Sequence, residues 1–205
     1  GWQTAQALRA LDAQLPITLV TECAGDVYDK PMLSVAMARG YSAEALVRER
    51  GGDAARRLGV RLMARTHAVH INAAQRQVRT TRGTLRYDQL VLAHGAQAAV
   101  PAGLPPSVCW RINHLGAYQQ LRAALGDAPK EVVIVGAGLV GSELANDLAL
   151  GGHRITLLDV HPVPLARWPA EQAGVPLLAA WADLPIRFVG CATVQSVQRD
   201  AQGRY

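Results

Sequence analysis

The sequence contains few cysteines, few aromatic residues and no long apolar run, and each shortage excludes a class of protein. The three cysteines, Cys23, Cys109 and Cys191, stand far apart in the 205 residues. Such spacing provides no metal-binding knuckle, no redox pair and no disulfide framework of a small secreted domain. We therefore expect no metal site and a protein of the reducing cytoplasm. A membrane span needs roughly 18 apolar residues in a row, so we expect no membrane partner.

Lysine is also scarce, because arginine supplies 19 of the 21 basic side chains and lysine only two. The formal net charge is +5. The surplus is scattered along the chain, whereas nucleic-acid-binding proteins typically carry a basic stripe with interleaved aromatic residues. We therefore expect no nucleic-acid partner. Half of the residues are hydrophobic, which is enough for a substantial core.

A Pro- and Gly-rich connector, residues 101–107, divides the sequence into two parts. We predict one domain over residues 1–107 and a second over residues 108–205. Before the connector, the pattern predicts a helix at the start of the chain, a strand at 17–20, one or two short helices over 42–58 interrupted at Gly51-Gly52, short strands at 60–63, 67–71 and 77–80, and an apolar strand at 90–93.

Strands and helices alternate after the connector. The expected elements are a helix through Leu115 and Leu125 capped by Asn113, a strand at 132–135, a helix at 139–150, a strand at 155–158, a Pro-interrupted helix near 169–183, and strands near 186–189 and 192–198. Strand–helix–strand succession with apolar strands favours a parallel α/β sheet.

The strongest local motif is a glycine-rich turn between a strand and a helix. Gly136, Gly138 and Gly141 follow the apolar run 132–135 with the G-x-G-x-x-G spacing of a Rossmann dinucleotide fingerprint. The first glycine makes the tight turn, the second lets a pyrophosphate approach the backbone, and the third lets the helix pack closely on the strand. The helix N-terminus then offers free N–H groups to the phosphates. A glycine turn used only for packing is the alternative.

An acidic residue follows the second strand of this motif. Asp159 ends the strand at 155–158, where a carboxylate accepts hydrogen bonds from a ribose 2′-OH and repels a 2′-phosphate. The position therefore favours NADH over NADPH.

The start of the chain has the same order of helix, strand and acid. Gly1 stands where the last glycine of a second fingerprint would be, and Glu22 follows the strand at 17–20 as its ribose acid. Any helix–strand pair that ends in glutamate would fit this pattern, so it carries weight only together with the motifs that follow.

Four segments give the chain a resemblance to a known family. They are Thr21-Glu22, residues 28–34 (Tyr-Asp-Lys-Pro-Met-Leu-Ser), residues 90–96 (Leu-Val-Leu-Ala-His-Gly-Ala) and residues 136–148. The chain resembles the FAD- and NAD(P)H-dependent pyridine nucleotide oxidoreductases, and within them the rubredoxin reductases, over nearly its whole length. The resemblance implies an α/β fold of two Rossmann-like, FAD/NAD(P)-binding three-layer domains. Both are incomplete here, since the first strand with its glycines, the later Gly-Asp flavin motif and the C-terminal interface domain of the family are missing. We therefore expect a fragment that binds little FAD and shows no turnover alone.

The resemblance also implies roles for single residues. Gly1 would lie against the FAD pyrophosphate, Thr21 and Glu22 at the FAD ribose, and the backbone of Ala68 at the adenine. Gly95, in the segment 90–96, is a further cofactor-binding candidate.

Two residues are implied to lie at the reacting rings. Lys30 would lie near the isoalloxazine, and Glu143 would reach the contact between flavin and nicotinamide. We take both as candidate catalytic residues and hypothesise that they form an ion pair. An exposed loop lysine is the alternative for Lys30.

The missing cysteines narrow the expected reaction. Disulfide reductases of this family carry a cysteine pair after the second strand, and its peroxidases and oxidases carry one cysteine near the position after Ser34, which is Val35 here. The resemblance therefore implies that electrons from NADH leave through FAD, one at a time, to rubredoxin or another small iron protein. The alternatives are an NADH-dependent ferredoxin reductase, the flavin portion of a nitrite reductase, and a dinucleotide-sensing protein without turnover.

Overall fold

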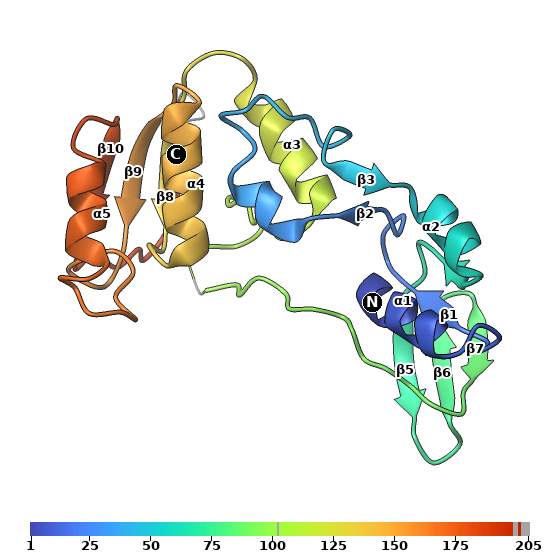
Figure 1. Cartoon of the computed structure of the whole chain (residues 1–205). Helices are drawn as coiled ribbons and strands as arrows, with labels where there is room; N and C mark the ends of the chain where they lie inside the picture. The colour runs from blue at the N-terminus through green and yellow to red at the C-terminus, as the bar shows by residue number, and fades with distance from the viewer. Residues whose placement is uncertain (102, 199–200, 202–205) are drawn as a thin grey trace. The chain divides into compact units, whose positions relative to one another are not determined.

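The computed structural model describes residues 1–101, 103–198 and 201. It contains two compact units (Figure 1). The first unit consists of Gly1–Tyr28 and Ala45–Ala96, and the second of Asp29–Glu44 and Gln97–Tyr205. The segment Asp29–Glu44 thus packs with the later part of the chain, although it lies before the connector in the sequence.

The first unit begins with a helix that packs beside a short parallel sheet. Helix α1 (Trp2–Leu11) leads to β1 (Thr18–Val20), which pairs in parallel with β4 (Arg61–Met63). Helix α2 (Gly51–Leu58) precedes β4. Ala5 of α1, Leu58 of α2 and Val60 form a small core against which Trp2, Ile17 and Leu19 pack. The helix and the strand that the sequence predicts at the start of the chain are therefore confirmed.

Two small antiparallel sheets complete this unit. Strand β2 (Val27–Tyr28) pairs with β3 (Val47–Glu49). Strands β5 (Ala68–Asn72), β6 (Gln77–Thr80) and β7 (Gly83–Arg86) form a meander in which each strand pairs with the next. The short strands predicted at 67–71 and 77–80 are therefore confirmed.

The prediction of one or two short helices over 42–58 is confirmed only for 51–58, and its interruption at Gly51-Gly52 is wrong. Residues 43–46 form turns, residues 47–49 form β3, and α2 begins at Gly51 instead of breaking there. A Cβ atom at Gly51 would lie 2.6 Å from the carbonyl oxygen of Ala24. The glycine therefore allows the first turn of α2 to pack against the 24–25 backbone.

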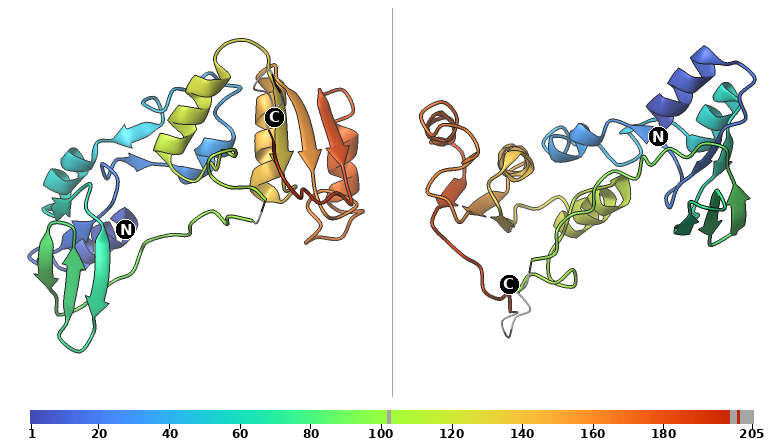
Figure 2. Two further views of the ribbon diagram at one scale, coloured as in Figure 1. Left: turned by 180° about the vertical axis from the view of Figure 1, so that it is seen from behind. Right: turned by 90° about the horizontal axis from the view of Figure 1, so that it is seen from below.

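The second unit contains a three-stranded parallel sheet of order β10-β9-β8. Strand β8 (Glu131–Val135), α4 (Leu139–Leu150) and β9 (Arg154–Leu158) form a βαβ unit, followed by α5 (Gly174–Ala180) and β10 (Ile186–Val189). Helices α4 and α5 cover the same face of the sheet (Figure 2). Ile155 and Leu157 of β9 are buried on the covered side, whereas Val133 and Val135 of β8 point to the opposite face and are exposed. The predicted parallel α/β sheet is confirmed.

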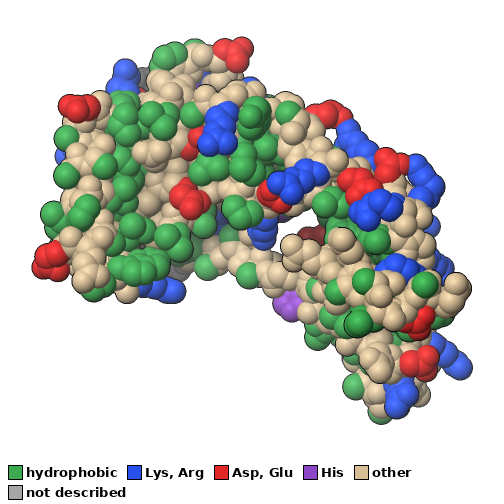
Figure 3. Space-filling view, in the orientation of Figure 1, with side chains coloured by type: hydrophobic (Ala, Val, Ile, Leu, Met, Phe, Trp, Pro, Cys, Tyr) green, Lys and Arg blue, Asp and Glu red, His purple; other side chains and the backbone are tan. Residues whose placement is uncertain are grey.

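Helix α3 (Leu115–Leu125) and the 3₁₀ helix η1 (Lys30–Ser34) also belong to the second unit. The predicted cap of α3, Asn113, is one residue too early. The N-cap is His114, whose Nδ1 accepts a hydrogen bond from the N–H of Ala117 at 3.1 Å. Hydrophobic side chains gather over α4 and α5 on the face in Figure 3. Among the exposed hydrophobic residues of these helices are Leu139, Val140 and Val175.

Two predicted strands do not form. Residues 90–93 and 192–198 run without regular structure, and Val91 and Leu92 are 58% and 64% exposed. Within the described residues neither segment pairs with another strand. A strand without a neighbour leaves its N–H and C=O groups to water, so the composition of a segment alone does not produce one.

Candidate functional site: a glycine turn, a helix terminus and two acidic positions

The glycine turn of the second unit joins β8 to α4. Gly136 has a φ of 102°, which favours glycine, and its N–H donates to the carbonyl of Leu158 at 2.8 Å. A Cβ atom at Gly138 would meet nothing within 4 Å, whereas one at Gly141 would lie 1.8 Å from the carbonyl oxygen of Gly136. The backbone at Gly138 is thus open to an approaching group, and Gly141 permits the close packing of α4 on the turn.

The first turn of α4 provides hydrogen-bond donors beside that opening. Helix α4 is 12 residues long and has Gly138 as its N-cap. The first N–H groups of a helix have no partner within the helix and carry the positive end of its dipole. An open backbone next to such donors fits a phosphate group.

Asp159 lies directly after β9, beside the same turn. Its Oδ2 accepts the N–H of Ala137 at 2.6 Å, and its Oδ1 accepts the N–H of His161 at 2.9 Å and lies 2.7 Å from His161 Nδ1. Burial raises the pKa of this carboxyl, but the donors from Ala137 and His161 outweigh burial, so the pKa is lowered overall. The carboxylate is therefore held ionised against the glycine turn.

The first unit places its acidic residue in a different environment. Thr21 follows β1 and is held between neighbours, since its N–H donates to Met63 and its carbonyl accepts from Thr66. Glu22 is 69% exposed, and its Oε2 lies 3.6 Å from Nδ1 of His67, the residue before Ala68. The structure thus brings Thr21, Glu22 and the start of β5 together.

Two other predicted positions of this unit are glycines. Gly1 is the N-cap of α1, and a Cβ atom there would lie 3.7 Å from Leu19 of β1. Gly95 has a φ of 70° and is exposed, and a Cβ atom there would meet nothing within 4 Å. The backbone at Gly95 therefore borders open space on the side where a side chain would lie.

Lys30 and Glu143 both lie in the second unit, on η1 and α4. Among the described residues no ion pair joins them; Glu143 Oε2 instead accepts the hydroxyl of Ser34 at 2.5 Å. The hypothesised Lys30–Glu143 ion pair is therefore absent from the structure, in which Glu143 accepts the Ser34 hydroxyl and the Lys30 side chain is exposed.

Sequence reasoning assigned no role to Ser34 or to Asp147. Asp147 is buried on α4, where its Oδ2 accepts the N–H of Met37 at 2.7 Å and its Oδ1 accepts the N–H of Ala38 at 3.1 Å. Burial raises the pKa of Asp147, and the two backbone donors offset this only in part. The sequence does carry a signal, since Glu143 and Asp147 are four positions apart and lie on one helix face.

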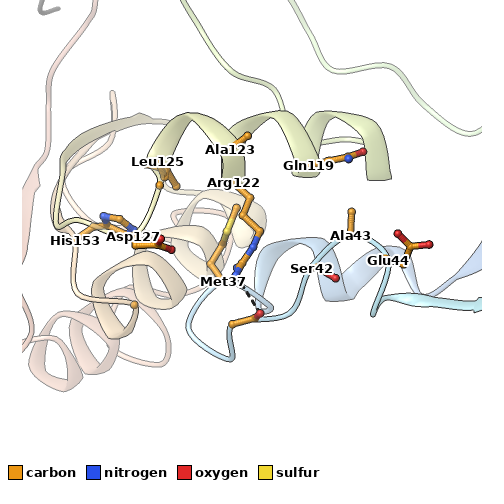
Figure 4. A pocket seen from close by; sticks show the side chains of 13 residues that line it. Met37, Ser42, Ala43, Glu44, Gln119, Arg122, Ala123, Leu125, Asp127 and His153 are labelled. Carbon is orange, nitrogen blue, oxygen red and sulfur yellow. Dashed lines mark hydrogen bonds between the residues drawn. The ribbon is translucent and has the colours of Figure 1, made fainter.

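A cavity of about 570 Å³ opens between α3 and the chain that follows η1 (Figure 4). Arg122 extends from α3 and its Nη2 donates to the carbonyl of Gly40 at 3.1 Å, while Tyr118 Oη donates to the carbonyl of Tyr41 at 2.6 Å. These contacts attach residues 40–41 to α3. His153, on the wall of the cavity, accepts the N–H of Lys130, and burial lowers its pKa.

The described part of the chain contains no helix long and apolar enough to cross a membrane. The same residues contain no group of three or more His, Cys, Asp or Glu side chains placed to hold a metal ion. All three cysteines are free thiols.

Comparison with known proteins identifies the family to which the chain belongs. The model of the pyridine nucleotide-disulphide oxidoreductase family matches residues 1–204. The Nitric oxide reductase FlRd-NAD(+) reductase of Aeromonas salmonicida is 40% identical over 166 residues, which are 80% of this chain and 42% of that protein. The protein of the same name from Klebsiella pneumoniae (strain 342) is 31% identical over 201 residues, 98% of this chain and 53% of that protein. The chain therefore spans about half the length of the curated relatives it matches.

Solved structures agree on the fold. The putidaredoxin reductase of a covalent complex with putidaredoxin has a TM-score of 0.86 at 25% identity, with 99% of this chain and 50% of that chain covered. The NADH:rubredoxin oxidoreductase of Clostridium acetobutylicum has a TM-score of 0.76 at 17% identity, with 95% and 51% covered. The predicted α/β fold with Rossmann-like domains, of which this chain holds part, is confirmed.

Proposed function

Because the chain belongs to the pyridine nucleotide-disulphide oxidoreductase family, we propose that the whole protein is a flavoprotein reductase that uses NADH, FAD and a small iron protein. The names of its curated relatives describe NAD(+) reductases of FlRd, and they support this choice. Rubredoxin is the first candidate for the electron acceptor. The cytoplasm remains the expected location, with three free thiols in support.

One observation carries the proposal: the glycine turn, the start of α4 and the ionised Asp159 lie around one opening. Gly138 leaves its backbone accessible, and the first N–H groups of α4 would bind the pyrophosphate of NADH. The remaining lone pairs of Asp159 would accept hydrogen bonds from the adenosine ribose. The same charge would repel the 2′-phosphate of NADPH, so NADH is the expected donor.

The first unit would hold FAD. Gly1, at the start of α1, would lie against the pyrophosphate, and Thr21 and Glu22 would bind the ribose. The backbone of Ala68 would meet the adenine, and Gly95 remains a candidate contact. We retain residues 1–107 as the FAD-binding domain and residues 108–205 as the NADH-binding domain. Asp29–Glu44 would then be the part of the first domain that packs with the second unit.

The bound cofactors supply the redox chemistry, in which a hydride passes from nicotinamide to flavin and the two electrons leave one at a time. The residues of this chain place the rings and control charge near them. Glu143 is held by the Ser34 hydroxyl, which fixes its carboxylate at the end of η1. The ammonium group of Lys30 would lie near the flavin, at the other end of η1. Val35 offers no thiol after Ser34, so no cysteine relay would carry the electrons.

Anaerobic titration of the FAD-loaded whole protein with NADH tests the proposal. We expect a yellow protein whose flavin absorbance NADH bleaches, and steady-state reduction of rubredoxin that exceeds that of ferredoxin or nitrite. A colourless protein, or a flavin that NADH fails to bleach, would refute the proposal; the latter outcome favours a dinucleotide sensor. Faster reduction of ferredoxin or nitrite would keep the flavoprotein and replace the acceptor.

Replacement of Glu143 by Ala tests its assignment separately. We expect stopped-flow reduction of the flavin to slow about tenfold or more, the usual effect of misplaced reacting groups, while the FAD content changes little. A matched replacement of Glu171, which is exposed in the same unit, should leave the rate unchanged. Unaltered reduction in the Glu143 variant would contradict its placement near the nicotinamide.

A further inference from the structure

The chain after η1 is irregular, yet side chains of α3 and α4 hold it at several points. Residues 35–40 form bends and turns, and Ala36 and Met37 are buried. Asp147 of α4 accepts the backbone N–H groups of Met37 and Ala38. Buried N–H groups in irregular chain need acceptors, and here a side chain supplies both. This contact joins residues 109 and 110 positions apart in the sequence.

A carboxylate is costly at this place unless its oxygens are hydrogen-bonded. Asp147 is 4% exposed, and its two oxygens accept from two consecutive N–H groups at 2.7 and 3.1 Å. An amide side chain of the same shape would place an NH₂ donor where one of these oxygens lies, facing one of the two N–H groups. The charge and the two oxygens of Asp147 therefore match the two donors. The reaction proposed above does not use this carboxylate.

Asp147 acts together with Glu143 on one face of α4. The two residues are one helical turn apart, and Glu143 accepts the Ser34 hydroxyl at 2.5 Å. Ser34 Oγ also lies 3.0 Å from the carbonyl oxygen of Pro31, and the N–H of Val35 donates to Met32, so η1 is closed by its own contacts. Holding residues 34–38 therefore also holds the end of η1, the helix on which Lys30 lies.

We propose that Asp147 is a positioning residue that fixes η1 against α4, so that Lys30 and Glu143 keep their relative placement at the reacting rings. The proposal rests on the proposed function for the roles of those two residues. Asp147 acts through the backbone of Met37 and Ala38.

Amide hydrogen exchange tests the contact itself, without cofactor or turnover. In Asp147→Asn one of the two donors loses its acceptor, so exchange at Met37 or Ala38 should be about tenfold faster or more, the effect of a lost hydrogen bond of roughly 1.4 kcal/mol. The matched control Asp183→Asn changes an exposed acid of the same unit and should leave these amides unchanged. Unaltered protection at both amides in Asp147→Asn would overturn the proposal.

Stopped-flow reduction of the FAD-loaded whole protein tests the consequence. Asp147→Asn should slow flavin reduction by NADH about tenfold, with the dissociation constant of NADH unchanged within about twofold. In a Glu143→Gln background the same change should have a smaller effect, because both residues act on one segment. Two results would overturn the positioning role: an unchanged rate of flavin reduction in Asp147→Asn, or an equal fold-change from Asp147→Asn with and without Glu143→Gln. If Asp147→Asn does not fold, Ser34→Ala replaces it, with slower reduction expected and an unchanged rate as the contrary result.

The two tests separate the two proposals. A whole protein that takes up no FAD would refute the proposed function and the link to Lys30 and Glu143. Faster exchange at Met37 or Ala38 in Asp147→Asn would still support the contact between α4 and the η1 segment.

Discussion

Both units place an acidic residue at the end of a parallel strand, but they hold it in different ways. Glu22, after β1, is exposed and has His67 at 3.6 Å as its partner. Asp159, after β9, is only 13% exposed and accepts hydrogen bonds from Ala137 and His161. The glycine turn itself supplies the Ala137 donor. The comparison shows that Asp159 is held from both sides, by the glycine turn before α4 and by His161 after β9.

The largest effect is expected from Gly141→Ala. The added methyl group would lie 1.8 Å from the carbonyl oxygen of Gly136, so α4 or the turn must move, at a cost of about 3 kcal/mol or more. Thermal unfolding would measure this loss. Gly138→Ala is the matched control, because its methyl group meets nothing within 4 Å; it should keep the melting temperature and weaken NADH binding. Equal melting temperatures for the two variants would contradict the close packing at Gly141.

Asp159→Ala should have the next largest effect, on cofactor choice. It removes a charged acceptor, and hydrogen bonds to charged groups contribute about 1.5–3 kcal/mol, so NADH binding should weaken roughly tenfold to a hundredfold. NADPH, whose phosphate is no longer repelled, should lose less. The dissociation constants of both nucleotides check this, and an unchanged NADH/NADPH ratio would refute the ribose assignment.

Glu22→Ala should have a smaller effect than Asp159→Ala. An exposed ion pair contributes about 0–1 kcal/mol, so the stability of the first unit should change little, and FAD affinity in the whole protein should fall by less than NADH affinity falls in Asp159→Ala. FAD binding followed by fluorescence would measure the difference. A larger loss of FAD affinity in Glu22→Ala than of NADH affinity in Asp159→Ala would contradict the difference between the two acids.

The smallest effect concerns pH, where Asp159 and Asp147 of the second unit should behave oppositely. The pKa of Asp159 is lowered from its ordinary 3.8, so its stabilisation is present above 3.8 and is lost as the pH falls through the lowered value. The pKa of Asp147 is raised from 3.8, so its contribution is present below 3.8 and is lost as the pH rises through the raised value.

Melting curves between pH 3 and pH 7, compared with Asp159→Asn and Asp147→Asn, check these signs. The difference in melting temperature from the natural chain should shrink on acidification for Asp159→Asn and grow for Asp147→Asn. A change of 1 kcal/mol corresponds to about 2–4 °C in a chain of this size. Parallel profiles for the two variants would contradict the opposite environments.

The sequence predicts the βαβ unit of the second unit well, because its signals are local. The apolar run at 132–135, the glycines and the helix at 139–150 follow one another directly, and the structure has α4 over Leu139–Leu150. The predicted strands at 90–93 and 192–198 fail for the opposite reason: a strand depends on a pairing partner, and the composition of one segment does not provide it.

The contacts of the candidate site were harder to predict. Residues near 34–38 meet α4 more than a hundred positions later, and no local pattern reports such a distance. The Lys30–Glu143 hypothesis predicted correctly that Glu143 of α4 contacts η1. It named the wrong partner on η1, since Glu143 accepts a hydrogen bond from Ser34 and not from Lys30.

Helix α4 thus carries two functional features. The glycine turn precedes its first residue, and Glu143 and Asp147, which contact residues 34–38, lie further along it. Each residue of an α-helix turns by about 100°. One residue inserted between Gly141 and Glu143 would therefore rotate both carboxylates away from Ser34 and Met37 while the glycine turn stayed in place. The number of residues between the glycine turn and the two carboxylates is consequently constrained, as well as the residue types. Natural variation in the length of the helix should therefore fall after Asp147.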